Sequence, residues 1–146
     1  MKTIIVDIAP KNIPKEDLED RMIELESLVS TYGGIVVVKR IQKRDTPDYS
    51  TYVGSGKLEE IIAEGEELGA EHIVIGNMLK PAQIYHINEM LEKKKSKIQA
   101  WDRLDLILKI FATHAVSPES RLQIELASIH HMGPRIFGMG MELSRQ

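Results

Sequence analysis

Hydrophobic residues up to Trp101 gather in four short runs, and longer stretches with helical periodicity separate them. The runs are rich in β-branched residues, as buried strands are, and they occupy 3–8, 35–38, 72–76 and 97–101. Between them, apolar residues recur at spacings of three and four, which indicates amphipathic helices. This alternation predicts an α/β fold: a four-stranded parallel sheet in the order 2-1-3-4, with helices on both faces.

Prolines and glycines mark the limits of the first three predicted helices. Pro14 begins an acidic helix that ends at 33–34, where two glycines follow each other. The second helix ends at Gly69, and the third begins with Pro81, a residue that suits the first turn of a helix. The strand at 35–38 is apolar at every position, which is typical of a strand covered on both faces.

Two more helices complete the predicted pattern. Asp102 is a favourable N-cap for the fourth helix, and Asp105 stands in the capping-box position. The fifth helix begins at 117–119 and lies outside the alternation, so we expect it to project from the sheet. We therefore divide the chain into an α/β N-terminal domain at 1–116 and the start of a helical hairpin or linker at 117–146.

The composition is that of an ordinary globular protein. Of the 146 residues, 42% are hydrophobic and 28% are charged, and the net charge of -3 gives no overall attraction to nucleic acid. The absence of cysteine excludes disulfides, thiolate metal sites and a cysteine nucleophile. No apolar run is long enough to span a membrane, and an acidic residue at position 7 comes too early for a signal peptide. We expect a cytoplasmic protein.

A glycine turn before the second helix is the first candidate site. Gly54 and Gly56 allow close backbone approach and positive φ, and Lys57 adds a positive charge beside the unpaired first amides of the helix. This arrangement is one interpretation of a weak phosphate site. A Walker A loop is excluded, because Thr51 stands in place of its first glycine and Leu58 in place of its Ser or Thr. A tight entry into the helix explains the turn equally simply.

Basic residues gather at the end of the second predicted strand. Lys39, Arg40, Lys43 and Arg44 fall within six positions. If the strand extends this far, alternation places the two lysines on one side and the two arginines on the other. A solvated strand end accounts for them, and an RNA-facing rim is the alternative. The lysines within 93–97 close the third helix, where cations suit the helix dipole.

No enzymatic constellation stands out in the sequence. The turn after the first strand, at 9–12, has no glycine and cannot be a Rossmann dinucleotide site. His130 and His131 are adjacent, so on a helix they point about 100° apart and cannot easily share a metal. A pair of surface histidines is the simpler interpretation.

Three stretches of the chain, in this order and spacing, resemble the N-terminal region of the HflX family of ribosome-associated GTPases. The first is 49–60, the second is 101–112, and the third is 121–127 followed by 133–136 and 143–146. The resemblance extends from roughly residue 2 to the end of the chain. The second and third stretches are more specific than the glycine turn alone.

The resemblance implies a domain that binds the large ribosomal subunit and its rRNA, in a GTPase that helps split or rescue stalled ribosomes under stress. It implies GTP and magnesium on a GTPase domain that this sequence lacks, so we expect no cofactor or catalysis in this chain. Its own GTPase domain is then a partner. The alternative is an auxiliary module that binds ATP through the glycine turn. One departure is Leu104, where the family usually has threonine.

The segment 132–141 is the expected functional tip. Glycine and proline at 133–134 are expected to end the last helix, and further glycines favour a loop. In such a loop Phe137 can pack on RNA bases while Arg135 meets phosphate. Arg145 follows shortly and is a further candidate RNA contact. A segment that is disordered without a second helix is the other interpretation.

Overall fold

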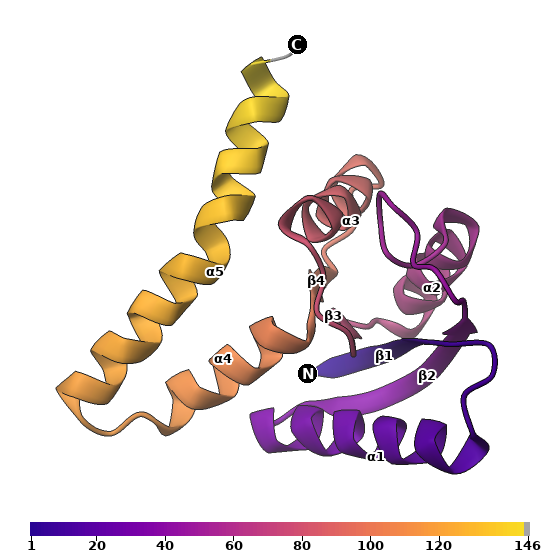
Figure 1. Ribbon diagram of the computed structural model, residues 1–146, viewed down its shortest axis with the longest axis horizontal. Coiled ribbons are helices and arrows are strands. Elements are labelled where there is room, and N and C mark those ends of the chain that lie inside the picture. Colours follow the sequence, from indigo (N-terminus) through magenta and orange to yellow (C-terminus); the bar gives the residue numbers. More distant parts are fainter. Residues whose placement is uncertain (145–146) are drawn as a thin grey trace.

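The computed structural model describes residues 1–144, and their side chains as far as residue 131. Its elements are β1 (Lys2–Ala9), α1 (Lys15–Tyr32), β2 (Ile35–Lys43), α2 (Ser55–Leu68), β3 (His72–Ile75), α3 (Pro81–Lys93), β4 (Gln99–Trp101), α4 (Arg103–His114) and α5 (Pro118–Ser144). The strands form one parallel sheet in the order β2-β1-β3-β4 (Figure 1). The predicted α/β fold and strand order are confirmed.

Helices cover both faces of the sheet, as predicted. β1 is an inner strand whose residues alternate between the faces, so that Ile4 and Val6 point to one side and Ile5 to the other. α2 and α3 pack against the first side through the buried residues Leu58, Ile61, Ile62, Ile84, Ile87 and Leu91. α1 and α4 pack against the second side through Met22, Leu25, Val29, Leu106 and Ile110. Burial of this apolar surface is the main stabilising contribution.

β2 differs from the prediction, because it is covered on one side only. It lies at the edge of the sheet, and Ile35 and Val37 are 64% and 37% exposed. A shift in register leaves Val37 without a partner, since Val36 pairs with Thr3 and Val38 with Ile4. The apolar run alone could not distinguish an inner strand from an edge strand with a bulge. The alternation predicted for its second half is confirmed, with the lysines exposed and the arginines half-buried.

The helix limits follow the prolines and glycines. Gly33 and Gly69 end α1 and α2 with φ angles of 106° and 69°, a left-handed conformation that strains any residue with a Cβ atom. Pro14 precedes α1, and Pro81 is the first residue of α3. These predictions are confirmed. The limits could be read from the sequence because they depend on local backbone geometry.

α5 projects from the sheet and contacts α3 and α4 (Figure 1). The prediction that it ends at 133–134 is wrong, because the helix continues to Ser144. Gly133 has no Cβ atom, and this removes part of the clash that Pro134 imposes on the residue before it. Proline then removes one helical hydrogen bond without ending the helix. Among the described residues, no helix is long and apolar enough to cross a membrane.

An aromatic cluster closes the α1/α4 side of the sheet. The ring of Trp101 lies 4.2 Å from that of His72 and 5.4 Å from that of Tyr32, measured between centroids. The ammonium group of Lys109 lies 5.8 Å from the Trp101 ring. Burial lowers the pKa of His72, whose Nδ1 atom has no hydrogen-bond partner among the described residues. The imidazole is therefore neutral in the folded protein at neutral pH.

We expect stability to depend on pH through His72. Because its pKa is lowered on folding, the unfolded chain binds more protons, so protonation favours unfolding. The free energy of unfolding should be constant above about pH 6.5 and fall as the pH drops below that value. Urea unfolding followed by fluorescence of Trp101 between pH 8 and pH 5 tests this, and His72→Gln should flatten the profile. The exposed His114, changed to Gln, is the matched control.

Leu25 should contribute strongly to stability, because it lies on the face of α1 that packs against the sheet and only 1% of it is exposed. Ile23, on the same helix, is 64% exposed. Leu25→Ala should lower the free energy of unfolding by about 2–5 kcal/mol, through lost burial and the cavity left behind. Ile23→Ala should change it by less than about 0.5 kcal/mol. Urea denaturation measures both, and equal losses would contradict the assigned packing of α1.

Candidate functional site

The glycine turn leads directly into α2, and neither Gly54 nor Gly56 has a positive φ. Gly54 is the N-cap, with φ of -54°, and its amide donates a hydrogen bond of 2.9 Å to Oε1 of Gln42. A Cβ atom on Gly54 would lie 2.8 Å from Nη1 of Arg44 and 2.9 Å from Nε2 of Gln42. Glycine thus lets these two side chains lie close to the turn, and a side chain at position 54 would require their flexible ends to move. Gly56 lies in the first turn, where an added Cβ atom would have no neighbour within 4 Å among the described residues.

The first turn of α2 leaves room for an anion without specifying one. No side chain among residues 1–131 caps the helix, so these leave the amides of Ser55, Gly56 and Lys57 available. The ammonium group of Lys57 lies 4.0 Å from Oε2 of Glu60, a carboxylate that competes with phosphate for it. The turn fits a weak phosphate contact and lacks the hydroxyl with which a P-loop holds magnesium.

Of the four basic residues Lys39, Arg40, Lys43 and Arg44, here called the basic rim of β2, two form ion pairs with acidic side chains. Nζ of Lys39 lies 2.7 Å from Oε2 of Glu26 on α1. The guanidinium group of Arg40 binds both carboxylate oxygens of Glu64 on α2. Such pairs reduce the attraction of these cations for an outside phosphate.

Lys43 and Arg44 remain the open cations of this rim. Lys43 has no ion-pair or hydrogen-bond partner within residues 1–131. Arg44 donates from Nε to the carbonyl oxygen of Thr46, at 3.0 Å, and makes no ion pair in the described part of the chain. Both lie at the carboxyl end of β2, where Arg44 approaches the glycine turn and Lys43 is exposed on the other side of the strand. Parallel sheets commonly bind ligands at the carboxyl ends of their strands.

The same edge holds a polar cluster that the sequence did not reveal. Nη2 of Arg21 on α1 lies 2.6 Å from Oδ1 of the buried Asp7 on β1. The side-chain amide of Asn77 pairs with the backbone of Ile8, donating to its carbonyl oxygen and accepting from its amide. Tyr52 has a φ of 65°, unusual for a residue with a side chain, and burial raises the pKa of its phenol. These contacts join residues up to 69 positions apart, so no local pattern signals them.

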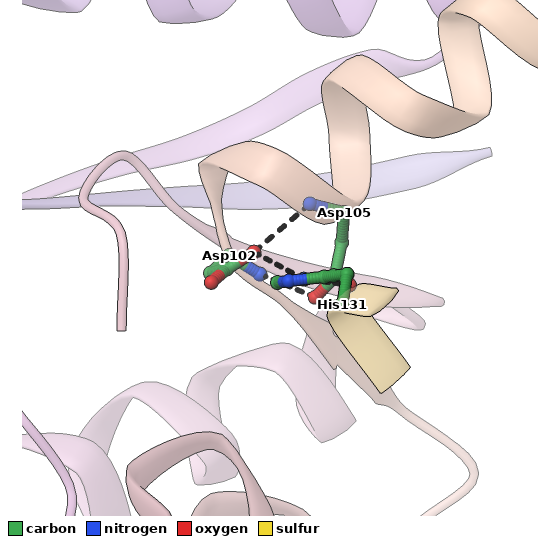
Figure 2. A group of neighbouring side chains, drawn as sticks. All are labelled: Asp102, Asp105 and His131. Atoms are coloured by element: carbon green, nitrogen blue, oxygen red, sulfur yellow. Dashed lines mark hydrogen bonds and ion pairs between the residues drawn. The ribbon is translucent and has the colours of Figure 1, made fainter. Parts of the chain in front are cut away.

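A second polar cluster joins α5 to the α/β domain (Figure 2). Asp102 and Asp105 form the predicted capping box of α4, each carboxylate accepting the other residue's amide at 2.9 Å. Nε2 of His131, on α5, lies 2.9 Å from Oδ1 of Asp105 and 3.5 Å from Oδ1 of Asp102. The surface position predicted for His131 is therefore wrong, because α5 folds back and buries this ring. His130 is exposed, as predicted.

This cluster has the residue types of a metal site, since one ligand atom from each of its three members lies within 4.8 Å of the others. The carboxylate oxygens already have hydrogen-bond donors, however. Oδ1 of Asp102 accepts the amide of Asp105, and Oδ2 accepts the amide of Leu79 at 3.2 Å. Helix capping and the contact with His131 account for the cluster, and we assign no metal to it.

The candidate RNA contacts on α5 are placed in part only. The backbone of Arg135 and Phe137 lies within the helix rather than in the predicted loop. Their side chains lie outside the described residues, and so does Arg145 as a whole. The predicted division at 116 and 117 falls between α4 and α5.

Residues 19–112 match a family model described as GTP-binding GTPase N-terminal. The chain belongs to this family. A relative from Flavobacterium psychrophilum, named GTPase HflX, is 40% identical over 145 residues, which are 99% of this chain and 34% of that protein. GTPase HflX of Alkalihalophilus pseudofirmus is 39% identical over 92% of this chain and 31% of its own length. The predicted HflX resemblance is thus confirmed, and the chain spans about a third of these relatives.

Solved structures of GTP-binding relatives share this fold. A GTP-binding protein from Sulfolobus solfataricus in complex with GDP has a TM-score of 0.68 and 29% identity, over 97% of this chain and 40% of that one. A second structure, described as a complex of SsGBP and GDP, has a TM-score of 0.71 and 28% identity, over 94% of this chain and 37% of that one. The HflX-type chain therefore matches a part of larger GTP-binding proteins.

The His131 contact should stabilise the docking of α5. His131→Ala should lower the free energy of unfolding by about 1–3 kcal/mol, because it removes a donor from the buried carboxylate of Asp105. Hydrogen exchange of α5 amides should accelerate as well. His130→Ala, on the exposed neighbour, is the matched control and should leave both measurements nearly unchanged. Equal effects of the two substitutions would contradict this role.

Proposed function

We propose that this domain binds the large ribosomal subunit through its rRNA, within an HflX-type GTPase that splits or rescues stalled ribosomes under stress. Membership of the family and the GTPase names of the relatives support the parent's activity. GTP and magnesium would bind a GTPase domain in the part of the relatives that this chain does not span. Residues 1–116 would dock on the ribosome in the cytoplasm, and 117–146 would begin the helical connection towards the GTPase domain.

The open cations at the carboxyl end of β2 carry the proposal for RNA. Arg44 lies beside the first turn of α2, because its Nη1 atom is close to Gly54, whereas Lys43 is exposed on the other side of the strand. Both groups are suited to phosphate, which supplies much of the affinity in nucleic-acid binding. Lys39 and Arg40 would join them where RNA displaces their acidic partners.

We also propose RNA contacts from the end of the chain. Arg135 would meet phosphate and Phe137 would stack on an unpaired base, with Arg145 as a further cation. A position on a projecting helix supports this role for the first two, because such a helix can reach a partner beyond the sheet. In the full-length protein, Arg135→Ala would then weaken binding to the large subunit.

Binding of ATP by this domain is the second candidate function. The free amides of Ser55, Gly56 and Lys57 favour it, since a helix N-terminus accepts phosphate. Saturable binding of ATP that Lys57→Ala abolishes would support this alternative. Binding of ribosomal subunits that ATP leaves unchanged would favour the RNA proposal.

The contribution of Lys43 to subunit binding can be measured by its salt dependence. Lys43→Gln should lower the slope of log affinity against log salt by about 0.7–0.9, the value of one phosphate contact. Lys2→Gln removes the same charge at the opposite edge of the sheet, where β1 begins, and should leave the slope unchanged. Sedimentation of the domain with large subunits over a range of salt concentrations gives both values. Identical slopes for wild type and Lys43→Gln would exclude Lys43 as a phosphate contact.

A further inference from the structure

The outer edge of β2 carries a row of open backbone groups. β2 is the first strand in the sheet order, and among the described residues it pairs with β1 only (Figure 1). The amide of Arg44 donates to the carbonyl oxygen of Ala9 on β1, at 2.8 Å. Alternate residues of a strand turn their amide and carbonyl groups to opposite sides, so positions 40 and 42 face β1 as well. The groups that point away from the sheet therefore belong to Lys39, Ile41 and Lys43.

One side-chain contact agrees with this orientation. Nη1 of Arg40 donates to the carbonyl oxygen of Lys39, at 2.9 Å, as expected of a carbonyl group that points away from β1. The outward groups of Ile41 and Lys43 have no hydrogen-bond partner within the part of the chain that the structure describes. An edge of this kind is a template for pairing with another extended chain.

An apolar groove of about 410 Å³ lies beside this edge, between β2 and α1. Its apolar lining consists of Leu18, Met22 and Ile23 from α1 and Ile41 from β2. Ile23 and Ile41 are 64% and 38% exposed, so the described residues leave apolar surface uncovered here.

The groove and the open backbone groups lie where one ligand can use both. The side chain of Ile41 lines the groove, and that of Lys39 reaches Glu26 on α1, so the outward row has its side chains on the α1 face of the sheet. In an antiparallel strand added to β2, the residues directly opposite this row point to the same face. Every second side chain of the added strand therefore lies over the groove.

The charges of the groove select against nucleic acid. Nζ of Lys39 lies 2.7 Å from Oε2 of Glu26, and the rest of the lining contains one further cation, Lys15, and one further carboxylate, Glu19. These charges cancel, so a phosphate backbone finds no net positive charge of the kind that supplies its affinity. An uncharged apolar segment fits this balance.

The charges of β2 also disfavour a second copy of this chain at the edge. A two-fold axis through Ile41 places Lys39 opposite Lys43 of the other copy. An axis through Lys39 or Arg40 places that residue opposite its own copy. Like charges directly opposite each other on paired strands are destabilising, and lysines on edge strands commonly prevent such pairing.

We propose that the groove between α1 and β2 binds an extended, uncharged apolar segment of a partner protein, which pairs with β2 as an added antiparallel strand. Main-chain hydrogen bonds to Ile41 and Lys43 supply affinity, and apolar side chains at alternate positions fill the groove beside Ile23. Antiparallel pairing is the more stable arrangement for each residue. The inference does not rest on the proposed contact with RNA, because it uses the backbone of Lys43 and leaves its side chain available to phosphate.

Amide hydrogen exchange of the 146-residue chain, followed at each residue by NMR, tests the open edge. In the free chain, the amides of Ile41 and Lys43 should exchange faster than those of Arg40 and Gln42, which are bonded to β1. The probe for the partner is a capped peptide of alternating valine and threonine, ~7 residues long, the length of an ordinary strand. Adding it should protect the amides of Ile41 and Lys43.

Two methylated versions of the peptide test the strand pairing. With its valines over the groove, the peptide turns the valine amides towards β2 and the threonine amides towards solvent. N-methylation of the valines should therefore abolish binding, and N-methylation of the threonines should retain it. Equal binding of the two peptides, or loss on threonine methylation alone, would overturn the proposal. This comparison does not depend on the folding of any variant.

A substitution in the groove tests the apolar contact. Ile41→Ala should weaken binding of the unmodified peptide by about tenfold, because the peptide then buries less apolar surface. Leu68→Ala, at the end of α2, is the matched control, since Leu68 is 44% exposed and does not line the groove. Wild-type affinity in Ile41→Ala would exclude the groove as the binding site.

Two further measurements test the identity of the partner. Sedimentation should show a monomer, and a dimer in which the amides of Ile41 and Lys43 are protected would assign the edge to a second copy of the chain. Single-stranded oligoadenylate should not protect these two amides. Protection by the oligonucleotide equal to that by the peptide would assign the groove to RNA and overturn the proposal.

Discussion

The buried carboxylate of Asp102 is the interaction on which the arrangement of the second half of the chain depends. It is fully buried at the end of β4, where an ionised group without partners would be strongly destabilising. The amides of Leu79 and Asp105 donate to it, and His131 approaches the same oxygen as the Asp105 amide. The loop after β3, the start of α4 and the projecting α5 therefore meet at one residue. Through His131, this polar cluster joins α5 to the rest of the domain.

The distribution of charge bears on the proposed contact with RNA. α1 is acidic, and its Glu26 neutralises Lys39 on the neighbouring strand. α2 contributes Glu64, which binds Arg40. Lys43 and Arg44, at the carboxyl end of β2, make no such ion pair among the described residues. A chain with a net charge of -3 can bind nucleic acid only through such local groups.

Much of the fold could be predicted because its causes are local. The apolar runs at β1, β3 and β4, and the helical periodicity between them, reflect which side chains each backbone conformation can bury. Gly33, Gly69 and Pro81 mark helix limits through their own backbone angles. The capping box of Asp102 and Asp105 is likewise a signal that spans only a few residues. Parallel pairing and strand order then follow from short right-handed connections.

The sequence by itself thus determined the strands, the helices, their order and the resemblance to HflX, since short-range preferences and motifs encode each of these. Only the tertiary structure decided which groups from distant positions meet. It made β2 an edge strand, brought Arg44 and Gln42 against Gly54, paired the basic rim with acidic side chains of α1 and α2, and buried His131 beside Asp105. Burial and ion pairing depend on contacts across the whole chain, and no local pattern contains them.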